Sequence, residues 1–586
     1  MRRRRAPQPS PPAPGRSARG LTPGRPTPRG TRSAGPLAGG PLAGGLLAAV
    51  LAACGAPPSA VEGEGAPAPL GPTRGYIVIS LDTLRADHLG CYGYSRPTSP
   101  FLDRLAERSV LFERAAVQYP STLISHMSLF TGYYPQQHGV LPPAAVLSPE
   151  IETLPERFAA AGFRTAGHTE GGFMAGAYGF ARGFEEFTDT PYADDRDIER
   201  TLDRGIGFLS GLGAEERFFL FLHTYSIHDP YEPPEPFDGA FWEGPPPQTF
   251  RPDGERLNEV NRGFRDIDAA TVEYFEALYD GSIRYAESVL EDFLEQLARL
   301  GLDGDTTVVI TSDHGEEFLE HGKMVHEQIY PENLFVPLLL VHPDLERGVR
   351  IGSLVESIDL APTLYELAGV GVPAGLPGTS LLRIVGAPDA SGRTEAYAEV
   401  ASAQAQKTLV VAEGGEVHQL VLSEQVEEPD GTWVPRRVDF DTDEERLDLR
   451  MISFERPRGL DIAVNGAPLR RLEVPNRWRP YQITLKRRPQ GNRVTFATSD
   501  CDASTPPGGR PRCLAIKVRG VSLRREELFD LSDDPLALVD LQRRAPELRD
   551  RLRRLLRRYR WEPIAGSVER QLESETRRTL EALGYL

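Results

Sequence analysis

The sequence predicts an α/β protein in which helices cover both faces of a wound, mostly parallel sheet. Three β-rich apolar runs each end in polar residues, and amphipathic helical patterns such as 99–107 and 270–300 lie between them. Alternation of strand and helix is typical of this architecture. The three runs with their closing residues are 76–81 with Asp82, 218–222 with His223, and 307–311 with Asp313 and His314.

The polar residues that close these strands are candidates for a common site. Ligands of wound parallel sheets bind outside the carboxyl ends of the strands, so we expect the three groups to converge on one crevice. The alternative is that each residue only terminates a strand or caps a helix.

The pattern of the chain changes after about residue 390, where short alternating strands predict a smaller β-rich subdomain. Terminal helices are expected over 546–560 and 569–583 because their leucines follow a helical spacing. We expect the chain to divide into a signal peptide with a lipobox (1–54), a disordered tether (55–74), the main α/β domain (75–400), a β-rich subdomain or insertion (401–523) and a C-terminal strand with helices (524–586).

The charge of the chain excludes one class of partner. Formal net charge is −18, and the first 53 residues carry nine arginines and no acid, so the remainder carries −27. Such an acidic body repels phosphate backbones, which argues against a general nucleic-acid-binding protein. A local basic pocket can still hold a small anion.

The N-terminal segment is typical of an export signal. A basic region is followed by a short apolar run and by 51–54, which ends in Cys54 and resembles a bacterial lipobox. Lipidation of Cys54 would make the protein an exported, membrane-anchored lipoprotein that faces the periplasm or the cell surface. A cleaved soluble protein, or a tail with a coincidental cysteine, remains the alternative. No second apolar stretch approaches the roughly 20 residues of a spanning helix.

A set of ordered motifs resembles the sulfatase family of the alkaline phosphatase superfamily. Segments 79–87 and 122–132 are similar to its opening and nucleophile segments, and 223–231 and 311–317 are similar to its histidine-bearing turn and second metal-binding segment. The resemblance continues in order through 336–338, 359–364, 378–381, 527–535 and 583–586. Ordered co-occurrence is far more specific than any one motif.

The resemblance implies a hydrolase site with one divalent metal ion. It assigns the metal ligands to Asp82, Thr122, Asp313 and His314, with Thr122 as the nucleophile, and a mixed O/N set of this kind suits Mn, Mg, Ca or Zn. A bound dication would lower the hydroxyl pKa of Thr122. Thr122 also precedes a helix expected to begin near Ser125, whose N–H groups would face an anion. The alternative role for Thr122 is a plain helix cap.

Several further polar residues are candidates for contact with an anionic ester substrate. His228 is the candidate proton donor because a loop histidine can titrate near neutral pH. The candidate substrate-binding residues are His126, His223, Lys323 and His326, with His321 as a further neighbour.

The nucleophile segment departs from the family pattern. In the family that this chain resembles, active sulfatases usually carry a Cys or Ser within a C/S-x-P-x-R motif. Thr122, Ile124 and His126 occupy the matching positions here. Threonine cannot be converted to formylglycine. A threonine nucleophile resembles lipoteichoic acid synthases and phosphoethanolamine transferases, which favours a phosphate ester over a sulfate ester on a glycan, lipid or small molecule. A noncatalytic glycan- or envelope-binding lipoprotein and a phospho-group transferase are the alternatives.

Overall fold

The computed structural model describes most of the chain from residue 70 to residue 569. The segment expected to be a signal peptide, with Cys54 as the expected lipidation residue, most of the expected tether and all but the first residue of the expected helix 569–583 lie outside the described residues. Within that span the undescribed positions are 141–144, 190–196, 248, 346–347, 388–391, 401–403, 426–431, 435–436, 443–445, 454–456, 476, 478, 487–491, 499–501, 505–511, 515, 520–523, 543, 561–563 and 565–567.

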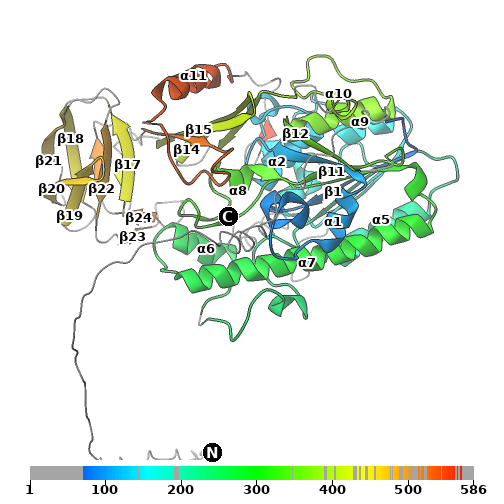
Figure 1. The fold of residues 1–586 in the computed structure, drawn as a ribbon, viewed down its shortest axis with the longest axis horizontal. Coiled ribbons are helices and arrows are strands. Elements are labelled where there is room, and N and C mark those ends of the chain that lie inside the picture. The colour runs from blue at the N-terminus through cyan, green and yellow to red at the C-terminus, as the bar shows by residue number, and fades with distance from the viewer. Residues whose placement is uncertain are drawn as a thin grey trace, which may run out of the picture. The chain divides into compact units, whose positions relative to one another are not determined.

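A nine-stranded sheet forms the centre of the fold (Figure 1). From the edge strand β5 inward, β5, β4, β6, β1 and β7 are all parallel, while β11 pairs antiparallel with β7 and leads to β2, β10 and β12. The strands are β1 (Gly75–Leu81), β2 (Ser109–Ala116), β4 (Arg164–Thr169), β5 (Glu186–Asp189), β6 (Phe218–Thr224), β7 (Thr306–Thr311), β10 (Phe335–Val336), β11 (Leu338–Val341) and β12 (Val349–Glu356).

Helices pack on both faces of this sheet, as the alternation of strands and helices predicted. Successive residues of β1 enter two different cores: Tyr76 and Val78 belong to one, Ile77 and Ile79 to the other. Figure 1 shows α7 along one face and α9 along the other. The first face carries α1 (Pro100–Ala106), α5 (Ile198–Ser210), α6 (Gly254–Asn261) and α7 (Ala269–Arg299); the second carries α2 (Thr122–Thr131), α4 (Leu154–Ala160), α9 (Leu360–Ala368) and α10 (Leu382–Val385). The predicted fold class is therefore confirmed.

The register of the three central strands brings their polar ends to one edge. Ser80 of β1 lies opposite His223 of β6 on one side and Thr311 of β7 on the other. Asp82 and Asp313 follow within two residues of these pairs. Parallel pairing on both sides of β1 therefore fixes where the candidate site forms.

A four-stranded antiparallel sheet crosses the expected division near residue 400. β13 (Glu395–Val400) pairs with β14 (Gln404–Glu413), which pairs with β15 (Glu416–Gln425) and through it with β26 (Arg524–Asp530). Helix α11 (Pro546–Leu556) packs Leu552 on this sheet. Strands from three of the expected segments, 75–400, 401–523 and 524–586, thus form one sheet. Local sequence patterns could not predict this, because they do not record pairing between strands that are far apart in the chain.

Two further four-stranded sheets make up the rest of the expected β-rich region. They share one apolar core, as in a β-sandwich, with Leu449 from one sheet and Phe496 from the other. One sheet contains β16 (Thr432–Val434), β25 (Ile516–Arg519), β18 (Arg446–Ser453) and β21 (Arg479–Thr484); the other contains β17 (Arg437–Thr442), β22 (Asn492–Ala497), β19 (Arg458–Val464) and β20 (Ala467–Val474).

The remaining elements are short. They are α3 (Pro135–His138), α8 (Pro331–Leu334), β3 (Ala145–Val146), β8 (Glu317–Phe318), β9 (Met324–Val325), β23 (Asp502–Ser504), β24 (Arg512–Leu514) and β27 (Val568–Glu569). Among the helices of the described residues, none is long and apolar enough to cross a membrane.

Candidate active site

Three ligand-type side chains meet at the carboxyl edge of the central sheet. One oxygen each of Asp82 and Asp313 and one ring nitrogen of His314 all lie within 4.8 Å of one another, and all three side chains are buried. Among the described residues, Oδ1 of Asp82 and Oδ2 of Asp313 receive no hydrogen bond. Buried carboxylate oxygens without donors are costly, so this set fits a divalent cation with mixed O/N coordination.

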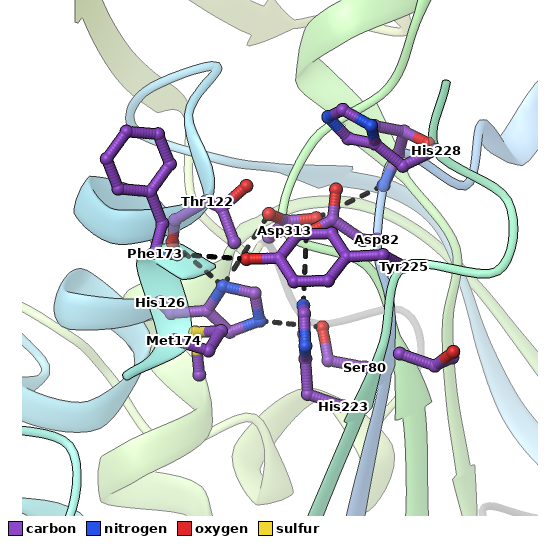
Figure 2. A network of polar contacts seen from close by, with 12 residues as sticks. Ser80, Asp82, Thr122, His126, Phe173, Met174, His223, Tyr225, His228 and Asp313 are labelled. Atoms are coloured by element: carbon purple, nitrogen blue, oxygen red, sulfur yellow. Dashed lines mark hydrogen bonds and ion pairs between the residues drawn. The ribbon is translucent and has the colours of Figure 1, made fainter. Parts of the chain in front are cut away.

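Thr122 lies beside this triad as the first residue of α2. Its Oγ1 is 3.5 Å from Nε2 of His314, and Figure 2 shows its side chain next to the carboxylate of Asp313. The helix begins three residues earlier than expected: Ser121 is the N-cap, and Ser125 supplies the first donor, to the Ser121 carbonyl oxygen at 2.9 Å. Thr122 therefore belongs to the first turn rather than preceding the helix, and the N–H groups of a first turn have no partner within their own helix and can bind an anion.

It is unfavourable for Asp82 and Asp313 both to be negatively charged, because they are buried and close together. Burial and the neighbouring charge of Asp313 raise the pKa of Asp82 well above its usual range, although a hydrogen bond with Thr122 lowers it in part. A bound cation would allow both groups to be ionised together. The electrostatics and the unpaired oxygens thus point to the same ligand.

Backbone geometry holds Asp313 in place. Thr83 adopts a left-handed conformation with φ of 60°, and its N–H donates to Oδ1 of Asp313 at 3.3 Å. The Ser125 hydroxyl donates to the Asp313 carbonyl oxygen at 2.6 Å, which ties α2 to the end of β7. A strained conformation at a non-glycine residue is typical of a functional site.

The imidazole of His314 is oriented toward the triad. Its Nδ1 donates to the Gly315 carbonyl oxygen at 2.9 Å, so Nε2 keeps its lone pair. Burial lowers the pKa of His314, which favours the neutral ring that a metal requires.

His126, a candidate for substrate binding, lies beneath Thr122 rather than over it. Its Nδ1 donates to the Thr122 carbonyl oxygen at 2.8 Å, and its Nε2 is 2.9 Å from the Ser80 hydroxyl. Figure 2 shows the ring between α2 and the end of β1. Both nitrogens therefore contact the protein, and the ring fixes the first turn of α2 against the sheet.

His223 supports a carboxylate of the triad. Its Nε2 lies 3.0 Å from Oδ2 of Asp82, and burial lowers its pKa well below the usual range. A neutral imidazole donating to a carboxylate orients that carboxylate, which is the arrangement found around metal ligands.

His228 and His326 lie next to each other beside the ligand set. The His326 ring centroid is 4.3 Å from that of His314 and 5.2 Å from that of His228. Nδ1 of His228 donates to the Asp229 carbonyl oxygen at 2.9 Å, and Nδ1 of His326 lies 3.2 Å from Oε1 of Glu316. Both candidates are thus within the same cluster of imidazoles.

Lys323 and His321 make other contacts. Nζ of Lys323 donates to the Asn261 carbonyl oxygen at 3.1 Å and lies 3.5 Å from Oε2 of Glu327. His321 is 2.6 Å from Oε1 of Glu332. In the described part of the chain, neither side chain has a hydrogen bond or ion pair with the triad.

A loop that the sequence did not single out closes one side of the site. The Tyr225 hydroxyl accepts from the Phe173 N–H at 3.1 Å, and Glu170 accepts from the Tyr225 N–H at 2.9 Å. Figure 2 shows Phe173 close to Thr122. The adjacent glycines Gly171 and Gly172, which both have positive φ, were the available signal for this tight turn.

Comparisons with known proteins agree with this architecture. The sulfatase family model matches residues 74–370. An ulvan-active sulfatase of Formosa agariphila is 26% identical over 360 residues, which cover 56% of this chain and 68% of that protein. Arylsulfatase K of Xenopus laevis is 36% identical over 111 residues, which are 19% of this chain and 21% of that protein. The chain therefore matches only about a fifth of the arylsulfatase K sequence.

Solved structures share the fold. A 2-O GAG sulfatase superposes with a TM-score of 0.54 at 18% identity, covering 83% of this chain and 92% of that one. The phosphonate monoester hydrolase of Agrobacterium radiobacter gives a TM-score of 0.53 at 16% identity, covering 85% and 100%.

Proposed function

Because the chain belongs to the sulfatase family of ester hydrolases, we propose that it cleaves an anionic ester with the Thr122 hydroxyl as nucleophile. The observation that carries the proposal is the pair of buried oxygens, one on Asp82 and one on Asp313, that accept no hydrogen bond within the described part of the chain. A noncatalytic relative would have no need to keep two buried carboxylates in mutual repulsion.

One divalent cation held by Asp82, Asp313, His314 and Thr122 completes the proposed site. When bound, it supplies a Lewis acid that lowers the hydroxyl pKa of Thr122 and neutralises a substrate oxygen. The imidazole ligand favours Mn²⁺ or Zn²⁺ over Ca²⁺, which prefers an all-oxygen shell.

The residues divide the chemistry between them. Oγ1 of Thr122 gives its proton to solvent and bonds to phosphorus, while the bond from phosphorus to the leaving oxygen breaks and that oxygen takes a proton from His228. Water then attacks phosphorus and gives a proton back to His228, the bond from phosphorus to Oγ1 breaks, and Oγ1 regains a proton from solvent as phosphate leaves. The N–H groups of the first turn of α2 orient the anion during both steps. His126 and His223 act as positioning residues for Thr122 and Asp82.

A phosphate or phosphonate ester suits this nucleophile better than a sulfate ester. A threonine side chain cannot form the aldehyde hydrate through which sulfatases with formylglycine release sulfate, whereas water can attack the phosphorus of a phosphothreonine directly. Sulfate ester hydrolysis is the second candidate, and the named activities of the ulvan-active and GAG sulfatase relatives favour it. Those names also support a glycan as the carrier of the ester.

The proposed location is the cell envelope, with Cys54 as the lipidated residue. The support is the apolar run that ends at Cys54 after a basic segment. Replacement of Cys54 by Ser should release the protein from the membrane fraction, and a variant that stays membrane-bound would contradict the anchor.

The test of the reaction is an assay with aryl phosphate, diaryl phosphate, aryl phosphonate and aryl sulfate under titration with Mn²⁺, Zn²⁺, Mg²⁺ and Ca²⁺. Thr122→Ala should lower kcat on the preferred ester by about 10³-fold or more. Thr131→Val, at the last residue of the same helix, is the matched control and should keep activity. Equal turnover by Thr122→Ala and the wild type would exclude Thr122 as the nucleophile.

A further inference from the structure

An open groove of about 520 Å³ lies between α7 and the loop that follows the proposed proton donor His228. Tyr231 and Leu278 are buried in its floor, and the half-buried rings of Phe250 and Tyr274 stand at its sides. Four prolines complete the apolar part of the lining: Pro233, Pro246, Pro247 and Pro252. Concave sites of this size with aromatic walls are typical of small-ligand subsites.

The aromatic walls are held in fixed positions. Trp242 contacts Tyr274 edge-on with ring centroids 5.2 Å apart, and Phe250 contacts Phe275 at 5.4 Å. The guanidinium of Arg265 lies 4.5 Å from the centroid of Phe250 on the other side. Side chains already fixed by their neighbours lose little entropy when a ligand binds.

The loop packs closely on α7 at a glycine. A Cβ at Gly281 would lie 2.4 Å from the Phe237 carbonyl oxygen, so the backbones approach each other only because this residue has no side chain. This contact holds the loop against the helix next to Asp238, which lines the groove.

The rim of the groove is polar but not cationic overall. Arg251 makes a bidentate contact with Glu232, with distances of 2.6 and 2.7 Å, and Asp238 adds a further negative charge. The arginine charge is thus matched, and an anionic group would meet net negative potential. Aromatic rings pack against the apolar face of a sugar ring, and planar polar groups such as a guanidinium or a carboxylate hydrogen-bond to its hydroxyl groups.

The floor of the groove packs toward the proposed active site. Tyr231 follows His228 by three residues, and its ring lies 5.5 Å from that of Phe318, which follows Glu317 in β8. Tyr231 also interacts with Glu316, the partner of His326. A ligand in the groove would therefore contact the ring of Tyr231, which connects to the imidazole cluster through Glu316, and would not lie over the triad.

We propose that this groove binds an uncharged sugar unit of the glycan that carries the ester, while the ester itself lies at Thr122. The inference rests on the proposed function for the position of the ester. Binding of the neutral sugar requires no turnover, so it can be tested separately from Thr122.

The probes are short neutral oligosaccharides of glucose, galactose, mannose and xylose, added to the full-length protein. Saturation-transfer NMR and calorimetry should detect binding of at least one series. Tyr274→Ala should weaken that binding by about tenfold, whereas Tyr274→Phe should retain it because the ring remains. Tyr133→Ala is the matched control, since Tyr133 is a half-buried tyrosine that packs on the core of the opposite sheet face, outside the groove.

Arg251→Ala provides a second variant at an exposed position, where loss of folding is not expected. It should weaken oligosaccharide binding several-fold. The proposal is overturned if no neutral oligosaccharide binds, if binding is unchanged in both Tyr274→Ala and Arg251→Ala, or if only sulfated glucose or an alkyl probe such as 1-hexanol occupies the groove. An inactive Thr122→Ala variant that still binds the sugar supports both proposals, whereas a fully active one rejects only the nucleophile.

Discussion

Nε2 of His223 lies 3.0 Å from Oδ2 of Asp82, while Oδ1 of that carboxylate accepts no hydrogen bond within the described residues. The imidazole thus fixes one oxygen and leaves the other directed to a cation. Replacement of His223 by Ala should weaken Mn²⁺ or Zn²⁺ affinity by about 10- to 100-fold, measured by metal titration. His168→Ala, a buried histidine of the neighbouring strand β4, is the control and should bind metal normally. Unchanged affinity in His223→Ala would remove its supporting role.

Cation binding should stabilise the protein. Two buried carboxylates repel each other without a cation, and ligand binding to the native state adds about 2.7 kcal/mol at a concentration of one hundred times Kd. Thermal melting with and without Mn²⁺ or Zn²⁺ should therefore show a higher Tm with the ion. Asp313→Asn should lose most of this increase, and an equal increase in both proteins would place the cation elsewhere.

His126 should influence catalysis through the position of Thr122. Removal of the ring in His126→Ala frees the first turn of α2, and we expect kcat to fall by about 10²-fold with little change in KM. Met127→Leu, at the adjacent buried position of the helix, conserves volume and should be close to wild type. A large increase in KM with unchanged kcat would instead indicate direct substrate binding by His126.

His138 should make stability depend on pH. Its Nδ1 accepts from the Val140 N–H at 3.1 Å, and burial lowers its pKa to about 3. The unfolded chain binds the proton more readily, so the free energy of unfolding should fall as pH decreases from about 6.5 towards 3, by at most about 1.4 kcal/mol per pH unit.

Urea unfolding of wild type and His138→Gln over this range isolates that contribution. The variant should be less stable at neutral pH and should lose less stability on acidification. Parallel curves for the two proteins would show that other buried histidines account for the whole effect.

The sequence pattern predicted where the triad forms but not all of its surroundings. The ends of β1 and β7 could be read from apolar runs, because buried parallel strands are continuous in hydrophobicity. The role of His126 was not evident from the sequence, because a helical side chain near Thr122 can point either toward the substrate or toward the sheet. Only the contact of its ring with Ser80 shows that it points toward the sheet. The loop at Phe173 and the pairing of β15 with β26 depend on contacts distant in sequence, which local periodicity does not record.

The parallel pairing of β1 with both β6 and β7 has a consequence for how the protein acquires its metal. Strand β7 and His314 leave the ribosome long after Asp82, so a partial chain that ends before His314 cannot assemble the ligand triad. The ion is therefore selected in the compartment where folding finishes. If the chain is exported unfolded, the metal ions available outside the cytoplasm determine which ion the site binds.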